Sequence, residues 1–283
     1  MKVKALLRQY DLQPRKSLGQ NFLHDEGVAA RILAAARLSP SDHVLEVGPG
    51  LGILTQGLAQ HAAHVVAIEL DDRLVQVLHK TLAHLPNVEV LHGDILQANP
   101  EDLIPSGVPY KVVANLPYYI TSAVTRHVLE ATIRPRLLVI MVQREVAERM
   151  TAGPGDMSLL AVSVQYYGAP RLVARVRSGA FYPRPEVDSA IVRIDVHDEL
   201  PAYGDTPDQF FRVVKAGFSQ RRKQIRNSLS SGLSLDRNEV ASALEAHGLD
   251  EKRRPQTFSV EEWGEVCEAM LPLLAHQSAK RHP

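Results

Sequence analysis

The sequence predicts an α/β fold, in which a doubly wound, mostly parallel sheet is followed by a small all-helical domain. Four short runs of apolar and β-branched residues are predicted as strands, at 44–47, 65–69, 88–91 and 111–114. Segments with helical periodicity alternate with them through residue 143, as in parallel sheets whose strands are joined by crossover helices. Residues 208–276 carry helical periodicity alone, which indicates a separate helical domain.

The second half of the chain predicts where the sheet ends and where the domains divide. Residues 157–167 are predicted to be helical, whereas 171–177 and 187–196 are predicted as strands with no long helix between them. We therefore expect an antiparallel hairpin at the sheet edge, followed by a linker rich in proline and glycine at 198–207. The expected organisation is a first domain over 1–200, a second over 208–276 with breaks at Gly232, Gly248 and Pro255, and a frayed tail over 277–283.

A glycine-rich segment, Glu46-Val-Gly-Pro-Gly-Leu-Gly52, connects the first strand to a helix predicted over 53–62. Gly48 and Gly50 are expected where the backbone needs positive φ and approaches a ligand closely. A dinucleotide fingerprint would place its third glycine at position 53, which is Ile53. The spacing thus favours a ligand without a pyrophosphate, such as S-adenosylmethionine. A tight turn that binds no ligand is the alternative.

Acidic residues follow the next two strands. Glu69 ends the second strand, 21 positions after Gly48, where a carboxylate can accept hydrogen bonds from a ribose diol. A role for Glu69 in capping the next helix is less favoured, because Asp71 and Asp72 follow it and suit a cap better. Asp94 follows the third strand and is predicted to accept a hydrogen bond from the adenine amine of the cofactor. A plain Gly-Asp turn is the alternative.

The fourth strand leads into Asn115-Leu116-Pro117-Tyr118. An exocyclic adenine amine is a poor nucleophile that carries two protons, so acceptors suit it better than a strong base. The Asn115 side-chain oxygen and a backbone carbonyl near Leu116 or Pro117 could accept both protons and aim the nitrogen lone pair. Pro117 restricts the backbone, and Tyr118 offers a face on which a base can stack. A strand-end turn with a packed tyrosine is the structural alternative.

Five ordered motifs give the chain a family resemblance: Lys16–Leu23, Glu46–Gly52, Asn115–Tyr118, Phe181–Ser189 and Phe218–Leu229. Together they resemble the RsmA (KsgA) family of 16S ribosomal RNA adenine N6,N6-dimethyltransferases, over about residues 14–263. Leu116 and the last motif favour this family over the similar 23S rRNA methylases, which usually have isoleucine in place of that leucine. The resemblance implies a Rossmann-like methyltransferase domain and a helical domain that docks ribosomal RNA.

The resemblance also assigns roles to single residues. It implies that S-adenosylmethionine is bound by Asn21, Leu23, Gly48, Gly50, Glu69, Asp94 and Asn115. It implies a catalytic set of Asn115, Leu116, Pro117, Tyr118 and Phe181, in which the two aromatic rings hold a flipped adenine. The implied partner is 16S rRNA in a precursor of the small (30S) subunit. Without the resemblance, Phe181 would be interpreted as an ordinary core aromatic.

Length and composition agree with the enzyme that the resemblance implies, whereas the zero net charge argues against a general nucleic-acid binder. The single cysteine, Cys267, excludes an internal disulfide and fits a reducing compartment. We expect no membrane span, no signal peptide, no bound metal and a monomer. The formal net charge is zero, but basic residues cluster at Arg8/Arg15/Lys16, at Lys252–Arg254 and at Arg221/Arg222/Lys223/Arg226. The last cluster is predicted to lie on one side of a helix and to contact RNA phosphates, with a merely solvated face as the alternative.

Two functions of other classes remain open from the sequence. One is a nicotinamide-dependent oxidoreductase, against which Ile53 and the Asn-Leu-Pro-Tyr segment argue. The other is a ribosome-assembly factor that acts mainly by binding, against which the undegraded motif positions argue. Thermal-shift measurements with each cofactor would separate the first alternative from a methyltransferase.

Overall fold

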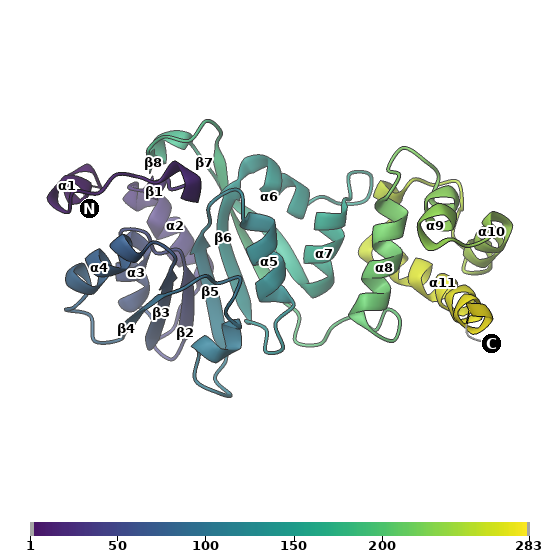
Figure 1. Cartoon of the computed structure of the whole chain (residues 1–283), viewed down its shortest axis with the longest axis horizontal. Coiled ribbons are helices and arrows are strands. Elements are labelled where there is room, and N and C mark those ends of the chain that lie inside the picture. The colour runs from purple at the N-terminus through teal and green to yellow at the C-terminus, as the bar shows by residue number, and fades with distance from the viewer. Residues whose placement is uncertain (1–2, 282–283) are drawn as a thin grey trace. The chain divides into compact units, whose positions relative to one another are not determined.

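The computed structural model describes residues 3–281 and divides the chain into two compact units (Figure 1). Unit 1 comprises the chain up to Glu148 together with Gly168–Asp198, and unit 2 comprises Arg149–Tyr167 together with the chain from Glu199 onward. The expected boundary near residue 200 therefore differs from the observed division. Residues 149–167 belong to unit 2 because their helix packs against the first helix of the C-terminal segment.

The described part of unit 1 contains nine strands and the helices that cover them. The strands are β1 (Phe22–Leu23), β2 (His43–Val47), β3 (His64–Glu69), β4 (Val88–His92), β5 (Tyr110–Asn115), β6 (Leu137–Gln143), β7 (Gly168–Val176), β8 (Phe181–Tyr182) and β9 (Ser189–Val196). The helices are α1 (Val3–Gln9), α2 (Glu26–Ala36), α3 (Ile53–Ala59), α4 (Asp72–Thr81), α5 (Thr121–Leu129) and α6 (Arg144–Met150), which runs across the boundary. Short 3₁₀ turns occupy Lys16–Leu18, Pro100–Leu103 and Ser178–Ala180.

Seven strands form the main sheet, in the order β4-β3-β2-β5-β6-β9-β7. The first five strands in this order are parallel, and β9 runs antiparallel to both β6 and β7. This confirms the predicted doubly wound sheet with an antiparallel hairpin at its edge. The strand order reverses between β2 and β5, which pair through Val47 and Ala114. Ligands of open α/β sheets bind at such a reversal, beyond the carboxyl ends of the strands.

Two helical layers bury the sheet. Helices α2, α3 and α4 cover one face and α5 covers the other (Figure 1), as right-handed crossovers require when the winding reverses. The apolar residues of β2 and β5 are almost fully buried, which explains why these strands appear in the sequence as continuous apolar runs. Val44 and Val113 pack with Leu54 and Leu58 of α3 in the core between sheet and helices.

A second, two-stranded sheet joins segments that lie far apart in the sequence. β1 pairs antiparallel with β8, so that Leu23 lies opposite Phe181 and Phe22 lies opposite Tyr182. This pairing brings the Gln-Asn-Phe-Leu motif beside the Phe-Tyr-Pro motif. Helix α1 packs its Val3 and Leu7 against Phe22, so the N-terminal segment is anchored to unit 1.

Unit 2 is all-helical, with α7 (Leu159–Tyr167), α8 (Pro207–Phe218), α9 (Ile225–Leu233), α10 (Arg237–Ala246), a 3₁₀ turn (Pro255–Thr257) and α11 (Val260–Arg281). Its core contains the fully buried Trp263, whose ring lies against Phe218 and Phe258. A Cβ at Gly217 would come within 2.3 Å of the Trp263 ring, so glycine permits this close packing. Residues 277–281, which were expected to form a frayed tail, continue α11, while 282–283 lie outside the described residues.

The basic segment of unit 2 differs from its prediction. α8 ends at Phe218 and α9 begins at Ile225, so Arg221, Arg222 and Lys223 lie in an exposed turn and not on a helix. The first amide of α9, that of Ile225, donates to the Arg253 carbonyl oxygen on a neighbouring loop at 2.7 Å and not to a preceding turn of helix. The Arg226 side chain is half-buried and donates to Glu251 at 2.8 Å.

Candidate active site

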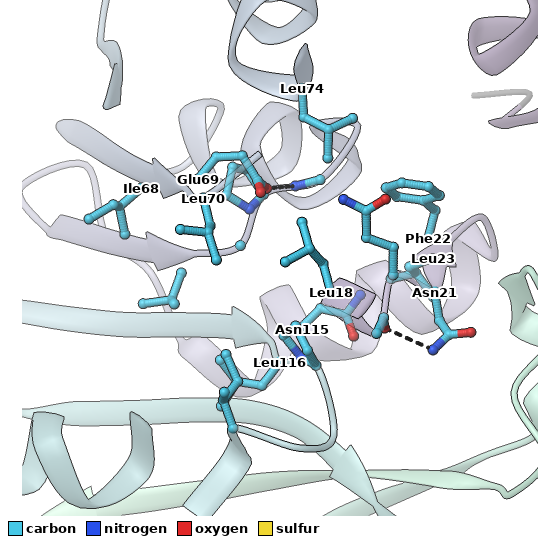
Figure 2. A pocket seen from close by; sticks show the side chains of 18 of the residues that line it. Leu18, Asn21, Phe22, Leu23, Ile68, Glu69, Leu70, Leu74, Asn115 and Leu116 are labelled. Carbon is cyan, nitrogen blue, oxygen red and sulfur yellow. Dashed lines mark hydrogen bonds between the residues drawn. The ribbon is translucent and has the colours of Figure 1, made fainter. Parts of the chain in front are cut away.

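One pocket gathers the motifs at the carboxyl ends of β2, β3, β4 and β5, at the point where the strand order reverses (Figure 2). Its empty volume is about 1020 Å³, part of which is open to solvent. All of the predicted cofactor and catalytic positions line it, namely Asn21, Leu23, Gly48, Gly50, Glu69, Asp94, Asn115, Leu116, Pro117, Tyr118 and Phe181. The sequence therefore located the lining of this pocket, although lining alone does not assign a role to each residue.

The glycine loop owes its shape to positive φ angles. Gly48, Gly50 and Gly52 have φ of 70°, 61° and 81°, a region in which residues with a Cβ are strained. The Gly48 amide donates to the Ile68 carbonyl oxygen at 3.0 Å. A Cβ at Gly48 would lie 3.8 Å from the Asn115 carbonyl oxygen. The loop after β2 thus runs next to the end of β5, where the target-binding motif begins.

Glu69 is fixed at the tip of β3 by two backbone donors. Its Oε2 accepts from the Gly50 amide at 3.0 Å (Figure 2). Its Oε1 accepts from the Asp71 amide at 3.0 Å. Burial raises the pKa of Glu69, while the amides of Asp71 and Gly50 lower it and the charge of Asp71 raises it further. Each carboxylate oxygen has two lone pairs, so each keeps one with which to accept a ligand hydroxyl.

A second carboxyl group lies buried under the loop. Glu46 is 1% exposed, and neither of its oxygens has a hydrogen-bond partner. The Thr55 hydroxyl on α3 is also buried without a partner. Burial raises the pKa of Glu46 to about 8, the closeness of the Thr55 hydroxyl opposes this rise, and the charge of the neighbouring Glu69 adds to it. A pKa of about 8 favours the protonated form of Glu46 at neutral pH, which the sequence motif did not reveal.

The charge of the pocket indicates the kind of ligand that it accepts. Glu69 and Asp94 line it, and no lysine, arginine or histidine does so anywhere in the part of the chain that the structure describes. Dinucleotide-binding folds hold a pyrophosphate on backbone amides and place an acidic residue on the ribose, so this charge pattern alone does not exclude a dinucleotide. S-adenosylmethionine, which carries a sulfonium, an ammonium and a ribose diol, fits this donor set. The nicotinamide-dependent alternative is disfavoured because Ile53 stands where the dinucleotide fingerprint has its third glycine.

Asp94 and Asn21 each use one polar atom within the protein. Asp94 Oδ1 accepts from the Leu96 amide at 2.9 Å, which stabilises the turn after β4. The turn-forming role and the proposed ligand role are thus compatible, because they can use different oxygens. Asn21 Nδ2 donates to the Gly19 carbonyl oxygen at 3.1 Å (Figure 2), which shapes the N-terminal wall of the pocket.

The Asn-Leu-Pro-Tyr segment is anchored at its proline. The Pro117 carbonyl oxygen accepts from the Ile120 amide at 3.2 Å and from the Thr121 hydroxyl at 3.3 Å. The Leu116 side chain is buried and holds the segment in place. Of the two backbone carbonyls that the sequence left open as acceptors, that of Pro117 is already occupied. The Leu116 carbonyl is therefore the better candidate.

The two candidate base-holding aromatics are fixed in different ways. The Tyr118 hydroxyl forms a 2.7 Å hydrogen bond with the hydroxyl of Ser189, a buried residue at the start of β9. Phe181 is 3% exposed and packs in the apolar core while also lining the pocket. Its core packing explains why the residues alone did not distinguish it from a structural aromatic.

The pocket also contains residues that the sequence interpretation missed. They are mainly apolar and aromatic, namely Leu18, Phe22, Ile68, Leu70, Ile95 and Tyr119. A Cβ at Gly50 would lie 3.3 Å from the Phe22 ring, so this aromatic packs directly on the glycine loop. Its position directly before Leu23, a predicted cofactor residue, was the signal available in the sequence.

The fold and the pocket define the protein as an S-adenosylmethionine-dependent methyltransferase. A family model described as "Ribosomal RNA adenine dimethylase" matches residues 12–270. The chain belongs to this family, which confirms the resemblance found in its motifs. The match spans segments of both units.

Individual relatives agree with the family assignment. The chain is 49% identical over 264 residues to a "Ribosomal RNA small subunit methyltransferase A" of Dehalococcoides mccartyi, with 93% of this chain and 91% of the relative covered. It is 44% identical over 277 residues to the protein of the same name from Moorella thermoacetica, covering 94% and 96%. Among solved structures it is similar to the 23S rRNA methyltransferase ErmE, with 33% identity, a TM-score of 0.72 and coverage of 88% and 99%.

Replacing Glu69 tests the ribose end of the pocket. We expect Glu69→Ala to weaken S-adenosylmethionine binding by about 1.5–3 kcal/mol, roughly 10- to 150-fold, because a charged acceptor is lost. Calorimetric titration measures the change, and circular dichroism verifies the fold. Glu89→Ala is a matched control, since Glu89 is exposed on the adjacent strand β4. Wild-type affinity in the Glu69 variant would remove this residue from the site.

Proposed function

We propose that this protein transfers methyl groups from S-adenosylmethionine to the N6 amines of two adjacent adenines near the 3′ end of 16S rRNA. The substrate would be a precursor of the small ribosomal subunit, and the product N6,N6-dimethyladenine. The observation that carries the proposal is the position of Asn115–Tyr118 beside Gly48, at the reversal of the strand order, in a pocket whose described lining includes acidic but no basic side chains. The names of the relatives favour the small-subunit rRNA.

The reaction needs two acceptors and no strong base. S-adenosylmethionine supplies a methyl group on a positively charged sulfur. Asn115 Oδ1 and the Leu116 carbonyl oxygen would accept the two amine protons and aim the nitrogen lone pair at that methyl group. No hydrogen bond among the described residues engages the Asn115 side chain, so its oxygen is available. Because residues 115–118 contain no Asp, Glu or His, the nitrogen would lose its proton to solvent after transfer.

The same acceptors can serve a second methylation. A monomethylated amine keeps one proton for an acceptor and can turn its methyl group aside. The base must first leave its stack, and the rings of Tyr118 and Phe181 would hold it in the pocket. The hydrogen bond between Tyr118 and Ser189 fixes one of these rings. Dimethylation then depends on room in the pocket and not on a second catalytic group.

Unit 2 would dock the RNA. Arg221, Arg222 and Lys223 are exposed in their turn, and the neighbouring loop adds the exposed Lys252 and Arg254. Arg226 and Arg253 contribute to structure, since they pair with Glu251 and Glu262. The exposed cations of these two neighbouring segments thus form one basic edge that suits phosphate contacts.

We infer that the protein acts as a monomer in the cytoplasm. Light scattering would test the oligomeric state, and cell fractionation would test the location.

Charge reversal tests this docking surface. We expect the triple change of Arg221, Arg222 and Lys223 to Glu to weaken binding to small-subunit particles at least tenfold and to lower the salt slope by about one per residue. Affinity for S-adenosylmethionine should stay unchanged. A matched control reverses Arg212, Lys215 and Arg237, three exposed cations elsewhere in unit 2. If the first triple variant methylates normally at physiological salt, its cluster is a solvated surface only.

Product analysis tests the proposed reaction itself. The protein would be incubated with S-adenosylmethionine and unmethylated small-subunit particles, and the digested rRNA analysed by mass spectrometry. We expect two N6,N6-dimethyladenines in the fragment at the 3′ end of 16S rRNA. Monomethyladenine alone, or methyl groups on a pyrimidine or a ribose, would contradict the proposal. Naked 23S rRNA serves as the second substrate, because the 33% identity to ErmE favours a 23S methylase as the alternative.

A further inference from the structure

The segment 15–21 crosses one wall of the cofactor pocket, and we refer to it as the strap. Its residues Leu18 to Asn21 line the pocket. Gly19 has a φ of 59°, and a Cβ there would lie 3.2 Å from the Tyr119 ring. The strap therefore fits closely against the loop that would hold the target base. Whatever fastens the strap also controls one side of the cofactor pocket.

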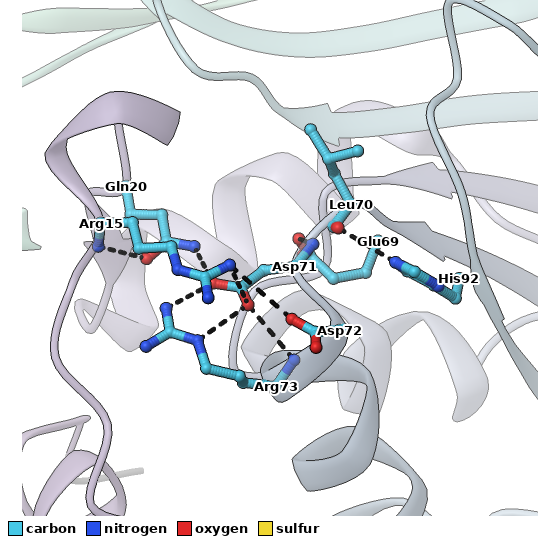
Figure 3. Close-up of polar contacts among 8 residues, drawn as sticks. All are labelled: Arg15, Gln20, Glu69, Leu70, Asp71, Asp72, Arg73 and His92. Atoms are coloured by element: carbon cyan, nitrogen blue, oxygen red, sulfur yellow. Dashed lines mark hydrogen bonds and ion pairs between the residues drawn. The ribbon is translucent and has the colours of Figure 1, made fainter.

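The side-chain hydrogen bonds that tie the strap to the rest of unit 1 all end on Asp71, within residues 3–281 (Figure 3). Arg15 Nη1 donates to Asp71 Oδ1 at 3.1 Å, and Gln20 Nε2 donates to Asp71 Oδ2 at 2.8 Å. The Gln20 side-chain oxygen in turn accepts from the Arg15 amide at 2.7 Å. The two ends of the strap are thus joined to each other and to the Asp71 carboxylate, and Arg15 also forms a longer ion pair, at 3.7 Å, with the exposed Asp72.

Asp71 is built to hold this position. Its side chain is 0% exposed, and Arg73 binds its two oxygens at 3.0 and 2.8 Å from the α4 side (Figure 3). Burial opposes ionisation, but hydrogen bonds from Arg73 and Gln20 lower the pKa of Asp71 to about 2. The carboxylate therefore remains charged throughout the physiological pH range. The Asp71 amide donates to Glu69 at 3.0 Å. Asp71 therefore contacts both the strap and Glu69, the residue predicted to bind the ribose.

We propose that Asp71 is a latch that fastens the strap over the bound cofactor, and that Arg15 is a positioning residue that sets the rate of cofactor release. The inference rests on the proposed use of S-adenosylmethionine. Two dimethylated adenines require four methyl transfers, so the spent cofactor must leave and be replaced between them. Opening a few hydrogen bonds is fast compared with unfolding. The latch can therefore permit exchange without loss of the fold.

The test compares Arg15→Ala with two variants that separate its contacts. Arg73→Gln is the matched control, because it removes a cation from the same carboxylate without touching the strap. Asp71→Asn weakens the latch but keeps a residue suited to the α4 N-cap. Release of labelled S-adenosylmethionine is followed by chase with unlabelled cofactor, alongside hydrogen exchange of 15–21 and steady-state kinetics.

We expect Arg15→Ala to release the cofactor about 3–10 times faster and to raise its KM similarly, because a partly exposed charged hydrogen bond to Asp71 is lost together with the longer ion pair to Asp72. The kcat at saturating cofactor should change less than twofold. Arg15→Lys should speed cofactor release less than Arg15→Ala does, and Asp71→Asn should speed it more. The rate of backbone hydrogen exchange should rise in residues 15–21 and stay unchanged in β2. If Arg15→Ala released the cofactor at a rate within twofold of both the wild type and Arg73→Gln, the latch would be overturned. If the wild-type protein bound no S-adenosylmethionine, the proposed function would fail instead.

Discussion

Asn115→Ala is expected to lower kcat for adenine methylation by about 10²–10³-fold, the cost typical of removing one preorganised polar group from a reacting centre. Asn115 ends β5 and lies between the glycine loop and the target-binding segment. Its side-chain oxygen would accept one amine proton, and without it the lone pair is no longer aimed at the methyl group. Single-turnover kinetics on small-subunit particles measure the effect. Binding of RNA should be retained, since the basic edge of unit 2 is unchanged.

Two further variants identify which property of Asn115 matters. Asn115→Asp keeps an acceptor oxygen and should retain more activity than Asn115→Ala. Tyr118→Ala should impair the holding of the base, whereas Tyr118→Phe keeps the ring and loses only the hydrogen bond to Ser189. A kcat of Asn115→Ala within tenfold of wild type, with cofactor affinity intact, would contradict the acceptor mechanism.

The parts of this fold that the sequence predicted well depend on local patterns. Parallel strands buried on both faces appear as apolar runs, so 44–47 and 65–69 were predicted within a residue of β2 and β3. Residues that follow such strands must meet at one sheet edge, which is why Glu69, Asp94 and Asn115 could be placed in one pocket before the structure was known. The alternation of strands and helices along the chain, together with the polar residues at the strand ends, sufficed for these predictions.

The parts that the sequence did not predict depend on contacts between distant segments. The pairing of β1 with β8 places Leu23 opposite Phe181. Each of these strands has only two residues, which is too short to give a periodic pattern in the sequence. After the turn at Arg221–Lys223, the first amide of α9 donates a hydrogen bond to the Arg253 carbonyl oxygen, which is distant in the sequence. The contact between Gln20 and Asp71 likewise spans 51 positions. No local propensity encodes such partners.

Glu46→Gln is expected to change how stability depends on pH. The pKa of Glu46 is about 8 in the folded protein, because of burial, against an ordinary value of 4.5. Between these values the folded state holds a proton that the unfolded state releases. The stability contributed by the neutral group is therefore complete below about pH 4.5 and is lost as pH rises toward 8. The loss amounts to at most about 5 kcal/mol for a shift of this size.

Glutamine resembles the protonated carboxyl in shape and cannot ionise, so the variant should lack this loss. At pH 5 its free energy of unfolding should lie close to that of the wild type, and at pH 8.5 it should exceed the wild-type value by about 3–5 kcal/mol. Urea unfolding at both pH values measures the difference, in which the titration of all other groups cancels. Glu89→Gln is the control, because this exposed side chain has water as an alternative partner. An equal effect of Glu46→Gln at pH 5 and pH 8.5 would show that Glu46 is ionised in the folded protein, and that the apolar surroundings under the glycine loop admit a charge.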